Sequence, residues 1–254
     1  MVNTRLVDFM DELNELVMKL ERSYQDRLVS VLLYGSGASR DHTQQRDRHS
    51  DLNVLCVLKE ITPRELGEGE PILRWWREQG YPSPLLMSEE ETQRSADCFP
   101  IEFRDMQDRR TVLYGVDIIA GVHVSMKNHR TQVEHELRAK LLRLRQQGAQ
   151  VLSDPGALWK LCMDSVGTFC TLGRHALLLS GGVALHDRRE VVRRLKELLG
   201  VPTSPLDVLL DLREEKVAAA GNAGELFAQY LEFIRRMIEF VDRLPVHKQE
   251  EEKS

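Results

Sequence analysis

The chain has 254 residues, enough for one large domain or two modest domains that each bury a hydrophobic core. Hydrophobic residues make up 42% and charged residues 30%, which is ordinary for a globular protein in water. The formal net charge of -5 argues against binding to an extended nucleic-acid backbone, which needs a basic face, but it is compatible with a small nucleotide substrate.

The composition also indicates the compartment. The N-terminal residues contain no signal-peptide hydrophobic segment, and no run approaches the roughly 20 apolar residues of a membrane span. We therefore expect a cytoplasmic protein without a membrane partner. The four cysteines form no Cys-x-x-Cys pair, so reduced thiols and no zinc site are expected at Cys56, Cys98, Cys162 and Cys170.

The first predicted elements are a helix and two strands. Apolar residues recur at helical spacing over residues 4–24, which predicts an amphipathic helix on one side of a sheet. Leu28–Tyr34 is a nearly continuous apolar run, typical of a strand buried on both faces. A polar loop over 37–50 leads to a second apolar strand, Leu52–Leu58.

A helix start follows the second strand. Thr62 is suited to be the N-cap, Pro63 to the first turn, and Glu65 to complete a capping box. The helix is expected to include Ile72–Gln79 and to end at Gly80.

Two more segments are predicted to join the sheet. Pro84–Met87 reads as a short strand, and Ser88 begins another helix. Pro100–Met106, in which Glu102 stands between Ile101 and Phe103, is the third candidate for the central sheet.

The pattern becomes helical after Val124, and no internal repeat is evident. We expect an α/β (α+β) domain over 1–125, a helical domain over 126–246 and a charged, disordered tail over 247–254. The predicted helices of the second domain are about 129–147, 156–180, 187–199, 204–218 and 223–243.

The motif with the clearest chemistry links the first two strands. Gly35 and Ser36 end the first strand, where exposed backbone N–H groups can hold phosphate oxygens. Residues 37–50 separate Ser36 from Asp51, an acid at the mouth of the next strand that can hold a divalent metal. Residues two apart in a strand share a face, so Asn53 projects beside Asp51.

This arrangement resembles the signature of the DNA polymerase beta-like nucleotidyltransferase superfamily: Gly-Ser, a spacer, then Asp-x-Asp/Glu in a strand. The chain departs from it at Asn53, which is neutral where the family has a second acid. The resemblance covers the first domain. It implies a small mixed sheet flanked by helices, as in aminoglycoside nucleotidyltransferases, whose C-terminal helical region helps to bind the acceptor.

The resemblance also implies the roles of individual residues. Gly35, Ser36 and Arg40 would contact the nucleotide triphosphate, although Arg40 is equally compatible with a solvated loop charge. Asp51 would hold Mg²⁺ or Mn²⁺, with Asn53 as a weak ligand because an amide oxygen supplies no charge.

A third acid is expected from a neighbouring strand. Glu102 is the best candidate, because it stands alone between Ile101 and Phe103 and so matches the family's pattern of an acid between apolar residues. Asp117, between Val116 and Ile118, is the runner-up.

Two functional hypotheses follow. In the first, the protein transfers a nucleoside monophosphate from Mg-NTP to a hydroxyl of a small molecule or a protein. In the second, it is a catalytically impaired nucleotide-sensing or partner-binding module, similar to antitoxin-like members of the superfamily. The acceptor is not identified by the sequence, and a homodimer is left open.

Overall fold

The computed structural model describes residues 4–35, 53–201 and 205–245, and the side chains of this part from Met10 onward. The chain forms two compact units, Met1–Val124 and Ser125–Ser254. Each unit has its own core and is described by itself.

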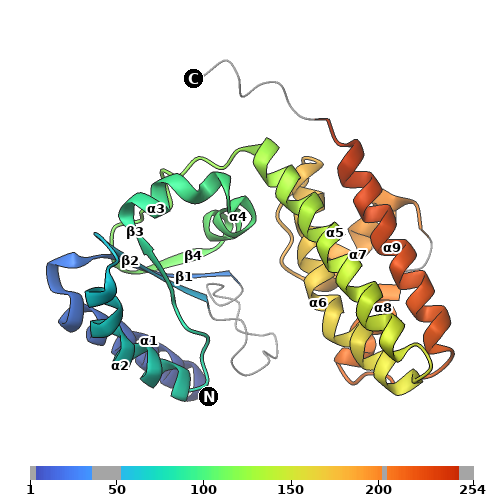
Figure 1. The fold of residues 1–254 in the computed structure, drawn as a ribbon, viewed down its shortest axis with the longest axis horizontal. Coiled ribbons are helices and arrows are strands. Elements are labelled where there is room, and N and C mark those ends of the chain that lie inside the picture. The colour runs from blue at the N-terminus through green and yellow to red at the C-terminus, as the bar shows by residue number, and fades with distance from the viewer. Residues whose placement is uncertain (1–3, 36–52, 202–204, 246–254) are drawn as a thin grey trace. The chain divides into compact units, whose positions relative to one another are not determined.

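The first unit is built on a mixed four-stranded sheet of order β3-β2-β1-β4 (Figure 1). Central strand β1 pairs antiparallel with both β2 and β4, whereas β2 and β3 are parallel. The strands are β1 (Leu28–Tyr34), β2 (Asn53–Leu58), β3 (Leu85–Ser88) and β4 (Arg110–Gly115).

Helices cover both faces of this sheet: α1 and α2 lie on one side, and α3 and α4 on the other (Figure 1). The alternation of side chains along the strands explains this arrangement. In β2, Val54 and Cys56 pack in the core under α1 and α2, and Leu55 packs in the opposite core. The helices are α1 (Thr4–Tyr24), α2 (Pro63–Glu78), α3 (Glu89–Arg94) and α4 (Pro100–Asp108).

The structure confirms the predicted fold class, and several local predictions agree with it. The Thr62 side chain accepts a hydrogen bond from the backbone N–H of Arg64, and the Glu65 side chain accepts one from the backbone N–H of Thr62. Ser88 caps α3 in the same way. Trp76 is fully buried in the core under α1 and α2.

The predicted strand at Pro100–Met106 is wrong, because this segment is helix α4. Its fully buried residues Phe103 and Met106 are three apart, which is a helical spacing, and they pack on the sheet. The fourth strand is instead β4, which the sequence analysis missed. It lies at the sheet edge and is largely exposed, so it lacks the apolar run that marked β1 and β2.

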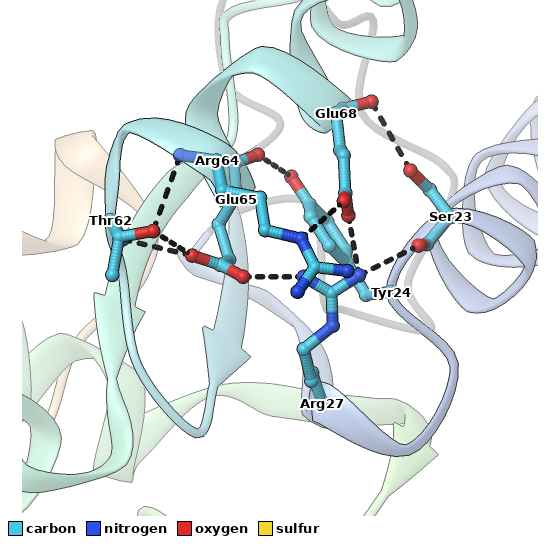
Figure 2. A network of polar contacts seen from close by, with 7 residues as sticks. All are labelled: Ser23, Tyr24, Arg27, Thr62, Arg64, Glu65 and Glu68. Carbon is cyan, nitrogen blue, oxygen red and sulfur yellow. Dashed lines mark hydrogen bonds and ion pairs between the residues drawn. The ribbon is translucent and has the colours of Figure 1, made fainter.

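A network of polar contacts joins α2 to the turn before β1 (Figure 2). The Arg27 guanidinium forms ion pairs with Glu65 and Glu68, and Glu65 is only 2% exposed. The Thr62 hydroxyl donates a hydrogen bond to Glu65, and the Tyr24 hydroxyl donates one to the Glu65 backbone carbonyl at 3.1 Å. A buried carboxylate is tolerated here because several donors satisfy it.

The second unit is a bundle of helices, in which α6 packs against α5, α7, α8 and α9. Small residues permit close packing: a Cβ atom on Gly148 of α5 would lie 2.3 Å from the ring of Phe227 on α9. The helices are α5 (Met126–Val151), α6 (Pro155–Leu179), α7 (Arg188–Leu199), α8 (Pro205–Arg213) and α9 (Ala223–Arg243).

Acid should weaken the first unit through Glu65. Hydrogen bonds from Thr62 and Arg27 lower the pKa of this carboxyl from 4.5 to about 2. Because the folded pKa is depressed, the stabilisation is complete above pH 4.5 and is lost as the pH falls toward 2. We expect Glu65→Gln to flatten this part of the pH dependence, measured by thermal unfolding between pH 2 and pH 7.

Glu78→Gln is the matched control, because Glu78 is an exposed acid on the same helix and should leave the acid profile unchanged. A Glu65→Gln profile parallel to that of the native protein would show that Glu65 does not carry the effect.

Candidate functional site

The candidate site is built around the end of β1. Gly35 follows the last residue of this strand and has φ +74°, a conformation that side-chain-bearing residues rarely adopt. Its backbone N–H donates a hydrogen bond to the carbonyl of Arg109 at 3.1 Å, just before β4 begins. The end of β1 is therefore fixed against its neighbour at Gly35, whose positive φ is typical of a turn residue.

Three side chains form a row across the sheet beside this turn. Tyr34, the last residue of β1, is directly opposite Asn53 of β2 on one side and Arg110 of β4 on the other. Directly opposed residues of antiparallel strands share a face. Tyr34 packs against the core that contains α4, so the row faces the α4 side of the sheet.

Asn53 lies close to the glycine. A Cβ atom built on Gly35 would be 3.2 Å from the Nδ2 atom of Asn53, so the carboxamide covers the Gly35 Cα atom. The side chain of Asn53 is nevertheless exposed at the start of β2. It can therefore meet a ligand that approaches the turn.

Helix α4 brings negative charge to this row. Burial, together with the negative charges of Glu102 and Asp105, raises the pKa of Tyr34 to about 12. These two acids are three residues apart on α4 and thus neighbours on one helix face. The Tyr34 hydroxyl therefore remains protonated at neutral pH and can donate a hydrogen bond.

Arg110 fixes the end of α4 to the sheet. Its guanidinium donates to the backbone carbonyls of Gln107 at 2.8 Å and Met106 at 3.4 Å, where a cation complements the helix C-terminus. Its Nε atom also donates to Asp117 at 2.7 Å, and this contact lowers the pKa of Asp117. Arg110 and Asp117 thus have a structural task in holding α4.

The structure describes some of the predicted site residues but not others. Gly35 and Asn53 are brought together, whereas Ser36, Arg40 and Asp51 lie outside the described residues. Glu102 is exposed on helix α4, so its expected position on a strand is wrong. Its negative charge nevertheless contributes to the raised pKa of Tyr34, which belongs to the row.

Sequence reasoning missed Tyr34, Asp105 and Arg110 as members of this site. Tyr34 ends the apolar run of the first strand, and its position directly before the Gly-Ser pair is the signal for it in the sequence. The signal for Asp105 was its spacing of three from Glu102, which becomes meaningful only if the segment is helical.

Within the described ranges, no three His, Cys, Asp or Glu side chains gather as a metal site. Over the same residues, no helix has both the length and the apolar character that crossing a bilayer requires.

The helical unit contains a buried histidine pair. The Nε2 atom of His129 on α5 and the Nδ1 atom of His175 on α6 are 2.9 Å apart, and both side chains are fully buried. One ring must donate an N–H hydrogen bond to the nitrogen of the other across this contact. Burial keeps both rings away from solvent, so they hold α5 to α6 rather than offer a surface site.

Comparison with known proteins finds a likeness of fold. No family model matches the chain, and no curated protein matches its sequence. Among solved structures, the chain is similar to spectinomycin adenyltransferase AAD(9) from Enterococcus faecialis, crystallised with ATP and spectinomycin. The TM-score is 0.57 at 10% identity, over 92% of this chain and 99% of that one. This likeness supports the nucleotidyltransferase-type fold.

Gly35→Ala should destabilise the first unit by roughly 1–3 kcal/mol, because alanine is strained at positive φ and its Cβ would press on Asn53. Gly67→Ala is the matched control, since a Cβ there meets nothing within 4 Å and helix α2 should gain stability. Differential scanning calorimetry of both variants tests this. Equal melting temperatures for Gly35→Ala and the native chain would contradict the role of Gly35.

Asp117→Asn should reduce stability by only about 0.2–1 kcal/mol, because the pair with Arg110 is partly exposed. If Asp117 has only this structural role, the Asp117→Asn variant should bind Mn²⁺ with the affinity of the native protein, measured by electron paramagnetic resonance. A clear loss of Mn²⁺ affinity would restore Asp117 as the third acid.

Proposed function

We propose that this protein is a nucleotidyltransferase that binds Mg²⁺-NTP, or Mn²⁺-NTP, and transfers a nucleoside monophosphate to a hydroxyl of a small molecule. The observation that carries the proposal is the turn at Gly35. This glycine follows β1, which pairs antiparallel with β2 in a mixed sheet of the nucleotidyltransferase type. The exposed side chain of Asn53, the first residue of β2, lies close to Gly35. The ATP and spectinomycin of the similar adenyltransferase support a nucleotide and a small acceptor as ligands.

The reaction would proceed by in-line displacement. An oxygen of the acceptor hydroxyl bonds to the α-phosphorus, the bond from that phosphorus to the pyrophosphate oxygen breaks, and the hydroxyl proton passes to a base or to water. Most of the rate enhancement in such a reaction comes from positioning and electrostatic stabilisation. Gly35 would shape the turn for the phosphates, and Ser36 and Arg40 would contact them.

Oxygen ligands suit the proposed metal. Asp51 and Glu102 are the proposed carboxylates, and Asp105 adds an oxygen donor on the same face of α4. Mg²⁺ and Mn²⁺ favour carboxylate oxygens, so the donors agree in kind with such an ion. A bound ion would neutralise negative charge on the phosphates.

One observation favours the second candidate function, a nucleotide-sensing or partner-binding module. None of the four described strands carries an aspartate or glutamate, and Asn53 is neutral. Among the described residues, the carboxylates that act on Tyr34 come from helix α4 instead. A site with fewer strand-borne acids would retain nucleotide binding more readily than transfer.

Two measurements separate these functions. Calorimetric titration with each NTP in the presence of Mg²⁺ reports binding, and pyrophosphate release over a panel of hydroxyl acceptors, including spectinomycin, reports transfer. We expect binding of at least one NTP. Asp51→Ala and Glu102→Gln should each weaken it about tenfold or more, because each removes a charge that faces the metal.

Glu60→Gln is the control, because it removes an exposed acid of the same unit outside the candidate site. Pyrophosphate release would establish the transferase, and NTP binding without release on any acceptor would favour the sensing module. Absence of binding with every NTP would refute both the transferase and the nucleotide-sensing module.

A further inference from the structure

The Gly35 turn needs a hydrogen-bond donor besides the glycine itself. The backbone N–H of Gly35 is already engaged with the carbonyl of Arg109 at 3.1 Å. A phosphate oxygen placed at this glycine would have to displace that bond, which holds β1 against the residue before β4. The contribution of Gly35 is therefore its conformation, and a phosphate near it must be bound by other groups.

The carboxamide of Asn53 is positioned to supply such a donor. Its nitrogen is the atom that lies 3.2 Å from the Cβ position of Gly35. The side chain is exposed, so its N–H groups are accessible to a ligand. The pairing of Asn53 with Tyr34 in the β1–β2 register holds the carboxamide at this point of the sheet.

The chemistry of the side chain allows it to bind an anion, which a carboxylate at this position could not do. A carboxamide offers two N–H donors, whereas a carboxylate at neutral pH offers none. The acids Glu102 and Asp105 already supply negative charge near Tyr34. A further carboxylate at position 53 would add repulsion against a phosphate, and the neutral amide avoids it.

We infer that Asn53 is a phosphate-binding residue, whose carboxamide donates a hydrogen bond to a phosphate oxygen of the nucleotide beside Gly35. This inference rests on the proposed function, because it takes the nucleotide to bind at this end of the sheet. It replaces the weak metal-ligand role expected from the sequence. Asn53, which stands where the family has a second acid, then adds a contact to phosphate and lacks the charged contact to a metal.

The two roles predict opposite signs for one substitution. Asn53→Asp keeps the shape of the side chain but exchanges its donor for a negative charge. A phosphate-binding role predicts that Mg²⁺-ATP affinity falls about tenfold to hundredfold, as for the loss of a hydrogen bond to a charged group. A metal-ligand role predicts that affinity rises, because the new carboxylate would attract the cation.

The experiment is a calorimetric titration of the full chain with Mg²⁺-ATP and with Mg²⁺-pyrophosphate. The variants are Asn53→Asp, Asn53→Ala and the control Asn14→Asp, which adds the same charge on an exposed position of α1. We expect weaker binding for both Asn53 variants, with Asp weaker than Ala, and native affinity for Asn14→Asp. Unchanged melting temperatures would confirm that the variants fold, as expected for an exposed side chain.

Other outcomes overturn specific statements. If native protein binds Mg²⁺-ATP and Asn53→Asp binds it equally well or more tightly, the inference is wrong while the proposed function stands. If native protein binds no NTP, the proposed function itself fails. If Asn53→Asp does not fold, Asn53→Ala decides, and its native-like affinity would overturn the inference.

Discussion

The first unit depends on one constraint, the double pairing of β1. This strand forms hydrogen bonds with β2 on one edge and with β4 on the other, and most of its side chains are buried. Its apolar residues alternate between the core under α1 and α2 and the core against α4. A shift of one residue would exchange these two sets, so the register is strongly specified. The same register places Asn53, Tyr34 and Arg110 in one row at the strand end. The geometry of the candidate site therefore follows from the packing and pairing of β1.

Much of the fold could be predicted because its signals are local. The apolar run of β1 and the capping box of α2 are readable within a few residues, and both are present in the structure. The error at α4 has a physical cause, since alternation over four residues fits a strand and a helix turn equally. The packing of Phe103 and Met106 on the sheet, which requires a helical spacing, distinguishes the helix from a strand. Strand β4 was missed because an exposed edge strand is held by pairing with β1, and its sequence carries little pattern of burial.

The candidate site was less predictable than the fold. Gly35 and Asn53 were identified because the motif that contains them is continuous with two strong strands. The contributions of Glu102 and Asp105 depend on how α4 packs, which is a matter of distant contacts. The fully engaged N–H of Gly35 could not be predicted either, since its acceptor, the Arg109 carbonyl, lies far along the chain. In this site, sequence patterns identified the residues of the turn, and tertiary structure determined which atoms remain available to a ligand.

The network around Arg27 has a consequence for how this sequence can vary. The Arg27 guanidinium forms ion pairs with the carboxylates of both Glu65 and Glu68, through two different nitrogen atoms. The single ammonium group of a lysine lacks this forked geometry, so Lys is a poor substitute. Loss of Arg27 alone would remove the cation that pairs with the buried Glu65 carboxylate, whereas simultaneous replacement of all three residues by apolar residues could be tolerated. The three positions are therefore coupled, and divergent homologues should keep all three residues or exchange them as a set.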